Sequence, residues 1–189
     1  MQMIHPSTSD AYLCALAEVY SSPQYKSAPR GLPIRERVNY MFTVLHPASA
    51  PITTLDFERN KVIREYTLKE MALYDLGTNR VEDFEKASSF WRKIANEDGT
   101  INSAYGYLLW KNKSCRSHDT QWEWAKASLI KDKDTRQAFF RFSLPDHQWW
   151  GNKDQVCTMH GNFLIRENEL HLTIVMRSND LVLGLVYDL

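Results

Sequence analysis

Cys157 and Arg177 are the two residues whose types and spacing most directly suggest chemistry. Cys157 precedes, and Arg177 follows, two apolar stretches, 161–165 and 170–176, that flank a polar turn at 166–169. This pattern predicts a β-hairpin, which would return Arg177 to the end of the sheet where Cys157 lies. A guanidinium beside a thiol favours the nucleophilic thiolate. The residues alone leave two interpretations open, a nucleophile or a buried cysteine that acts as a small apolar side chain.

The other potential nucleophiles and metal ligands show no comparable pattern. Cys14, Cys115 and Cys157 are odd in number and lack CxxC spacing, which disfavours a disulfide framework and a structural zinc site. The 6 histidines lack the spacing of metal ligands, so no metal is expected.

Composition excludes several classes of protein. The chain of 189 residues is 43% hydrophobic and 24% charged, the balance of an ordinary globular domain. Lys plus Arg equals Asp plus Glu at 23 each, so no basic field predicts binding to long nucleic acid or to an anionic membrane. The sequence has no leader-like start and no apolar run of membrane-spanning length. A soluble, cytoplasmic protein is therefore expected.

The elements that must position these residues are those of one α/β domain covering residues 1–189. Ser7, Thr8 and Ser9 offer N-caps for a helix from about Asp10 to Tyr20. Periodicity and composition predict the remaining elements. These are a strand at 38–45, helices at 61–76, 81–95 and 121–130, a strand at 138–143, and the hairpin.

Four separate segments resemble, in the same order, the thymidylate synthase and pyrimidine nucleotide hydroxymethylase superfamily. Met176 to Gly184 contains the Arg-Ser-x-Asp-x-x-x-Gly pattern, and the interval from Cys157 to Arg177 matches that between the family's nucleophile and arginine. Upstream, Phe90-Trp91 and the segment from Gly99 to Tyr105-Gly106 resemble the family's stretch from a tryptophan to a Tyr-Gly pair. Glu70, seven residues before Gly77, matches the family's spacing from glutamate to glycine.

The resemblance implies the family's fold, a mixed sheet flanked by helices, and a pyrimidine nucleoside monophosphate as substrate. Cys157 would add to carbon 6 of the pyrimidine, and Glu70 would order water and move protons near the base. Arg177 and Ser178 would hold the nucleotide phosphate. In a homodimer with shared active sites, Arg136 would reach that phosphate from the partner subunit, while Gln137 replaces the family's second arginine.

The resemblance also implies a folate co-substrate, 5,10-methylenetetrahydrofolate. Trp91, Asp180 and Gly184 match positions on the folate side, with Trp91 stacking on the pterin and Asp180 accepting a hydrogen bond from its ring. A core tryptophan and a strand-end aspartate are the alternative interpretations of the first two residues. Arg30 matches, by looser spacing, a loop arginine that folds over the phosphate. An exposed loop arginine is an equally good interpretation of that residue.

Two positions favour deoxycytidylate (dCMP) hydroxymethylation over thymidylate synthesis. Thymidylate synthases usually have Cys-His where this chain has Cys157-Thr158, and Asn where it has Asp188, whereas phage dCMP hydroxymethylases have Cys-Thr and Asp. The implied reaction joins dCMP, methylenetetrahydrofolate and water to give 5-hydroxymethyl-dCMP and tetrahydrofolate. The implied setting is the synthesis of modified DNA precursors by a phage in its host cytoplasm.

The sequence stops at Leu189, whereas the family continues with helices and a sugar-binding His-x-Tyr segment. The chain therefore resembles a family member that lacks the C-terminal part. A non-catalytic nucleotide-binding homologue or a fragment remains open, as do deoxyuridylate hydroxymethylation and thymidylate synthesis. The choice between ribo- and deoxynucleotide also stays open.

Overall fold

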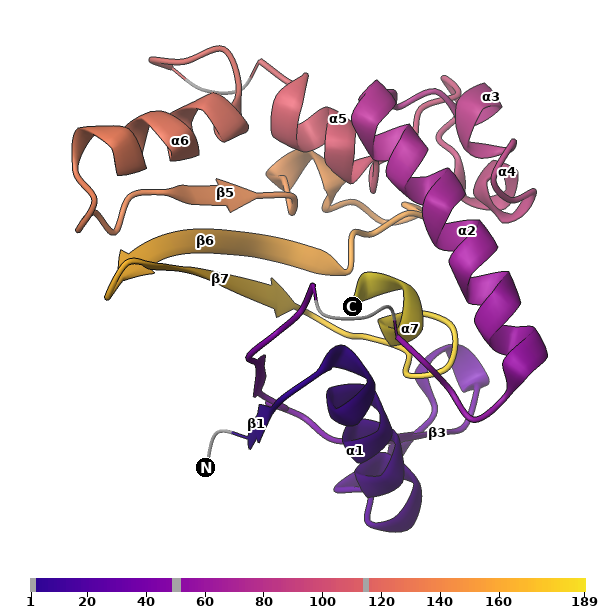
Figure 1. Ribbon diagram of the computed structural model, residues 1–189. Helices are drawn as coiled ribbons and strands as arrows, with labels where there is room; N and C mark the ends of the chain where they lie inside the picture. The colour runs from indigo at the N-terminus through magenta and orange to yellow at the C-terminus, as the bar shows by residue number, and fades with distance from the viewer. Residues whose placement is uncertain (1–2, 49–51, 114–115) are drawn as a thin grey trace. The chain divides into compact units, whose positions relative to one another are not determined.

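The computed structural model describes residues 3–48, 52–113 and 116–189. The chain forms two compact units: unit 1 comprises the residues up to Thr67 together with Asp180–Leu189, and unit 2 comprises Leu68–Asn179. Helices and small sheets occur in both (Figure 1), which confirms the expected α/β class. No described helix is both long and apolar enough to cross a bilayer.

Unit 1 is built around α1 (Thr8–Ser21), and Ser7 caps that helix by accepting a hydrogen bond from Asp10 N at 3.2 Å. The helix predicted from the serine cluster is therefore confirmed. Tyr12 and Ala15 on α1 pack with the C-terminal residues Leu185 and Val186. The other elements of unit 1 are β1 (Met3–His5) parallel to β4 (Phe42–Val44), the antiparallel pair β2 (Tyr25–Ser27) and β3 (Ile34–Glu36), the 3₁₀ turn η1 (Pro29–Gly31), α7 (Leu185–Asp188), and the first part of α2 (Phe57–Leu76).

Unit 2 contains a three-stranded antiparallel sheet in the order β5 (Phe139–Arg141), β6 (Thr158–Arg166), β7 (Glu169–Met176). The predicted hairpin is confirmed as β6 and β7. Glu167 and Asn168 at its turn both have positive φ, at 53° and 65°, as a two-residue type I′ turn requires. The other elements of unit 2 are the end of α2, α3 (Val81–Phe84), α4 (Phe90–Ile94), α5 (Tyr105–Trp110), α6 (Gln121–Lys131) and the 3₁₀ turn η2 (Pro145–His147).

Three predicted elements are shorter than expected. The helix predicted at 81–95 is broken into α3 and α4, because the Ser88 hydroxyl accepts a hydrogen bond from Phe90 N at 3.2 Å and begins a new short helix. The strand predicted at 38–45 is reduced to Phe42–Val44. Asn39, at φ 55°, interrupts the extended backbone before it. The helices predicted at 61–76 and 121–130 are confirmed as α2 and α6, whereas the strand predicted at 138–143 is reduced to β5 (Phe139–Arg141).

Gly106 allows α5 to approach α2 closely. A Cβ atom at this position would lie 2.4 Å from the carbonyl oxygen of Tyr74, nearer than two such atoms can approach. Beside this contact, Trp110 Nε1 donates a hydrogen bond to the same carbonyl at 2.7 Å. The Tyr105-Gly106 pair therefore has a packing role, since it fixes α5 against the helix that carries Glu70.

Candidate active site

The β6–β7 hairpin brings Cys157 and Arg177 together, as their spacing predicts. Thr158, the first residue of β6, pairs with Met176, the last residue of β7. Just beyond this pair, Arg177 N donates a hydrogen bond to Cys157 O at 3.0 Å. Cys157 lies in an irregular segment directly before β6, and its side chain is half-buried. The end of the sheet therefore presents a thiol and a guanidinium on adjacent chain segments.

The guanidinium of Arg177 is held in place by the segment that carries the cysteine. Nε donates to Val156 O at 2.8 Å and Nη2 donates to Gln155 O at 2.7 Å. Nη2 also lies 3.7 Å from Cys157 Sγ, and Nη1 donates to Ser178 Oγ at 3.1 Å. These contacts place a fixed positive charge beside the sulfur of Cys157.

Glu70 lies on a face of α2 that connects to the cysteine segment through two tyrosines. Tyr74 is one helical turn after Glu70 and therefore shares its face. The rings of Tyr74 and Tyr105 meet edge-to-face with centroids 6.2 Å apart, and the Tyr105 hydroxyl accepts a hydrogen bond from Thr158 N at 3.3 Å. Glu70 itself is half-buried.

A hydrogen-bond network around Asp154 was not predicted from the sequence. Asp154 is only 5% exposed, and its carboxylate accepts hydrogen bonds from Ser103 N at 2.8 Å and Ser103 Oγ at 2.7 Å. Asn102 Nδ2 donates to Asp154 O at 3.3 Å and to Asn152 Oδ1 at 3.1 Å. The matched segment 99–106 contained both Asn102 and Ser103, but sequence separation hid their contact with residues 152–154.

His147 is part of the same neighbourhood. Its carbonyl accepts a hydrogen bond from Asn152 Nδ2 at 2.6 Å, and its ring is buried. Burial lowers the pKa of His147 below the usual histidine range, against an opposing effect from Asp154 and Asp146. Burial therefore favours the neutral form of the imidazole.

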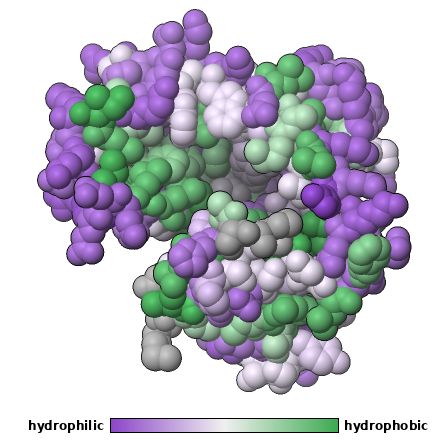
Figure 2. Space-filling view, viewed as in Figure 1, coloured by the Kyte–Doolittle hydropathy of each residue, from purple (hydrophilic) through white to green (hydrophobic). Residues whose placement is uncertain are grey.

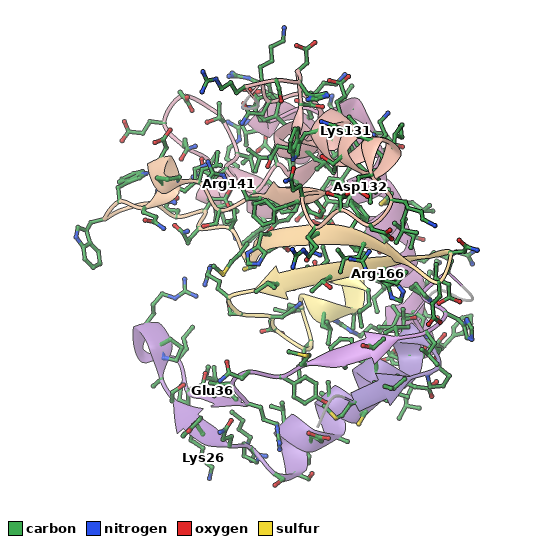
Figure 3. The ribbon with its side chains drawn as sticks, turned by 90° about the vertical axis from the view of Figure 1, so that its left-hand side faces the viewer. Lys26, Glu36, Lys131, Asp132, Arg141 and Arg166 are labelled. Carbon is green, nitrogen blue, oxygen red and sulfur yellow. The ribbon has the colours of Figure 1, made fainter. Side chains whose placement is uncertain are left out.

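Arg136 lies at the opposite end of the sheet from Cys157. β5 pairs with β6 through Phe139 and Asn162, so the residues before Phe139 run toward the hairpin turn. In agreement with this, Arg166 Nη2 donates to Asp134 O at 3.3 Å. Figure 3 shows Lys131, Asp132 and Arg166 at one end of the sheet and Arg141 toward the other. Because a strand rises about 3.3 Å per residue, the length of β6 puts roughly 25 Å between Arg136 and Cys157.

Trp91 is 8% exposed and belongs to a core cluster of unit 2. Its ring meets Phe84 edge-to-face with centroids 4.9 Å apart. The structure therefore places Trp91 in the core, and not as an open face on which a pterin could stack.

The remaining expected site residues belong to unit 1. The Asp180 carboxylate accepts hydrogen bonds through Oδ1 from Val182 N and Leu183 N, both at 2.7 Å. The same turn is closed by Gly184 N, which donates to Asp180 O at 2.9 Å. Asp188 is exposed at the end of α7. Arg30 is exposed in the loop between β2 and β3, with a left-handed backbone at φ 54°.

Cys14 has different surroundings from Cys157. Its Sγ lies 3.8 Å from the Glu18 carboxylate, so its neighbour is an acidic group and not a guanidinium. Burial, together with Glu18 and Cys14, raises the pKa of Tyr40 to about 12.

Cys115 lies outside the described residues. Across the described part of the chain, no group of three or more His, Cys, Asp or Glu side chains is arranged to hold a metal ion.

The chain is similar to known proteins over most of its length. The thymidylate synthase family model matches residues 10–189. The chain is 30% identical over 125 residues to the deoxycytidylate 5-hydroxymethyltransferase of enterobacteria phage T4, a match that covers 64% of this chain and 49% of the phage protein. It is 29% identical over 128 residues to the thymidylate synthase of Bacillus atrophaeus, covering 66% of this chain and 56% of that one.

Among solved structures, the chain is similar to the thermostable thymidylate synthase A from Bacillus subtilis, with a TM-score of 0.52 and 25% identity. That match covers 66% of this chain and 46% of the other. The chain thus spans about half the length of the relatives it matches.

Proposed function

This chain belongs to the thymidylate synthase family, and on that premise we propose that it transfers a one-carbon unit to carbon 5 of a pyrimidine nucleotide, with dCMP as the preferred substrate. The observation that carries this proposal is the contact between Arg177 and Cys157, since a thiolate is the form that adds to the ring. Addition of Sγ to carbon 6 pushes the ring electrons toward carbon 5, which becomes the nucleophile.

Arg177 has hydrogen-bonding capacity left for a phosphate. Its Nε and one Nη2 donor are engaged by carbonyls of the cysteine segment, while Nη1 faces Ser178 Oγ. A guanidinium edge with a neighbouring hydroxyl suits phosphate oxygens. The same residue can therefore hold the nucleotide and stabilise the attacking sulfur, which aligns carbon 6 with Cys157.

We extend the proposal to a homodimer in which the partner subunit's Arg136 completes the phosphate site. Within one chain, Arg136 and Cys157 are at opposite ends of β6, too far apart for both to touch one nucleotide. A side chain from a second copy would remove this separation. Gln137 would contribute a neutral donor where the family has a second arginine.

The edge strand β7 supports a contact with further protein. Alternate residues Leu170, Leu172 and Ile174 are 62%, 53% and 43% exposed. Figure 2 shows hydrophobic side chains gathered over the sheet on the face in view. An apolar stretch on an edge strand is a surface that proteins usually cover.

Glu70 is the proposed group for proton transfer. Placed acids and bases typically contribute about 10² to 10⁴ in rate. The path from α2 through Tyr74 and Tyr105 to Thr158 supports this role, since it ties the glutamate's face to the residue after Cys157. Loss of the carbon 5 proton and delivery of water to the one-carbon unit are the steps this carboxylate would assist.

When bound, 5,10-methylenetetrahydrofolate supplies the one-carbon unit. Asp180 fits this co-substrate, because two backbone amides fix the direction of its carboxylate toward a donor such as a pterin N–H. Gly184 would serve by holding the turn that carries Asp180.

The preference for cytosine rests on Asp188 and Thr158. An ionised carboxylate only accepts hydrogen bonds, so Asp188 suits the exocyclic amine of cytosine and not the carbonyl of uracil. The similarity to the phage T4 enzyme, named for deoxycytidylate hydroxymethylation, supports the same choice. Similarity to thymidylate synthases keeps deoxyuridylate (dUMP) as the competing substrate.

The direct test is to incubate the chain with dCMP or dUMP and methylenetetrahydrofolate, and to identify the products by mass spectrometry. The proposal predicts 5-hydroxymethyl-dCMP and tetrahydrofolate. Thymidylate or 5-hydroxymethyl-dUMP would shift the assignment to uracil. Binding of dCMP without turnover would identify a non-catalytic homologue, or a chain that needs the rest of a longer protein.

A further inference from the structure

Asp154 lies three residues before Cys157 in a segment without regular secondary structure. Along this segment, Asp154 and Val156 are buried at 5% and 1% exposure, whereas Gln155 and Cys157 are half-buried. This alternation is typical of an extended chain that turns every second side chain inward. Asp154 and Val156 therefore anchor the segment and leave Cys157 on its other side.

The anchor for Asp154 is Ser103, which donates to the carboxylate from both its backbone N and its Oγ. Ser103 is itself held firmly, because its neighbours Ile101 and Ala104 are core residues at 3% and 1% exposure. Two hydrogen bonds from one fixed residue orient a carboxylate more strictly than a single bond does.

The position of the segment determines where Arg177 lies. Two carbonyls of the segment, Gln155 O and Val156 O, accept hydrogen bonds from the guanidinium, and these contacts hold Nη2 near Cys157 Sγ. A shift of the segment would move both carbonyls and the sulfur together. The contact between cation and sulfur therefore depends on whatever fixes residues 154–156.

We infer that Asp154 and Ser103 form a positioning pair that holds the Cys157 segment in register with Arg177, so that the thiol stays activated. This inference rests on the proposed function of Cys157 as the nucleophile. Asp154 acts through the backbone and touches no substrate. Its contribution lies in hydrogen-bond geometry, not in its negative charge, which taken alone would disfavour a nearby thiolate.

The test is the rate at which iodoacetamide alkylates Cys157 at neutral pH, followed by peptide mass spectrometry, because that rate reports the thiolate. Asp154→Ala should slow alkylation by about tenfold or more, the effect expected when a thiol loses a neighbouring cation. Asp154→Asn should restore a rate near that of the wild type, because its Oδ1 can accept from Ser103 N and its Nδ2 can donate to Ser103 Oγ. Ser103→Ala, which loses only one bond, should give a smaller decrease.

A matched control separates positioning from loss of stability. Ile63→Val removes one methylene from the core of unit 1, away from Ser103 and Asp154, and it should lower the melting temperature without changing the alkylation rate. An unchanged or faster rate in folded Asp154→Ala, or an Asn variant as slow as the Ala variant, would overturn the inference. If Asp154→Ala does not fold, Ser103→Ala decides, and a wild-type rate there overturns it. Alkylation needs neither nucleotide nor folate, so absence of turnover would contradict the proposed function without touching this result.

Discussion

Arg177 is bound by the same chain segment whose cysteine it approaches: its Nε and Nη2 are held by the carbonyls of Val156 and Gln155, and Nη2 lies 3.7 Å from Cys157 Sγ. A lysine cannot reproduce this arrangement, because its ammonium lacks the planar fork. Arg177→Lys should therefore lower kcat/KM by at least about 100-fold, or about 2.7 kcal/mol of transition-state stabilisation. Arg141→Lys, at an exposed position of β5, is the matched control and should retain wild-type kinetics. Equal kinetics in the two variants would argue against a role for the guanidinium fork.

Mixing two inactive variants tests the shared site. In a mixed dimer of Cys157→Ser and Arg136→Ala chains, one of the two sites combines an intact cysteine with an intact arginine from the other chain. Random exchange should restore about a quarter of wild-type activity. Cys157→Ser mixed with Arg177→Ala should restore none, because both residues belong to the same side of the site. If subunit exchange is demonstrated and the first pair stays inactive, the shared site is refuted.

Asp188→Asn tests the choice of base. An asparagine amide can donate to the uracil carbonyl and accept from its ring N–H, whereas the carboxylate accepts only. The substitution should shift kcat/KM from dCMP toward dUMP by at least about tenfold, or about 1.4 kcal/mol. Measuring both substrates on both proteins gives the answer. A wild type that already prefers dUMP would remove the cytidylate assignment and leave the family assignment intact.

His147 should make the fold sensitive to mild acid. Burial lowers its pKa in the folded state, so below about pH 6.5 the unfolded chain binds a proton that the folded chain refuses. Stability from this group is therefore present above that pH and falls as the pH decreases, by up to about 1.4 kcal/mol per unit. Urea unfolding from pH 7.5 to 5 should show this slope in the wild type and a flatter one in His147→Gln. The control is His171→Gln, at an exposed position of β7, which should show the same slope as the wild type. If His147→Gln also shows the wild-type slope, the loss of stability in acid comes from other groups.

The hairpin and the helices at its periphery could be predicted from sequence because their patterns are local. Alternating apolar residues around the 166–169 turn specify β6 and β7, and Ser7 marks the start of α1. The break between α3 and α4 could not be predicted, because it depends on a side-chain bond from Ser88 that competes with a continuous helix. The short pairing of β1 with β4 joins residues about forty positions apart, which no local pattern encodes.

In the site, too, contacts set by a local pattern could be predicted, and contacts between segments far apart in the sequence could not. The approach of Arg177 to Cys157 follows from hairpin geometry. The Asp154 carboxylate, in contrast, bonds Ser103 across 51 positions, so only the folded chain reveals it. Trp91 shows the limit of matching a motif, since its ring packs in the core of unit 2 against Phe84.

The central claim is that Cys157 is the nucleophile, and a covalent adduct tests it most directly. The chain would be incubated with methylenetetrahydrofolate and 5-fluoro-dCMP, in which fluorine replaces the proton that must leave carbon 5, so that the adduct accumulates. We expect mass spectrometry to locate the nucleotide on the peptide containing Cys157. Cys157→Ser should form no adduct, whereas Cys14→Ser, whose thiol lies beside Glu18, should form it as the wild type does. An adduct on another residue, or turnover that persists in Cys157→Ser, would contradict the account.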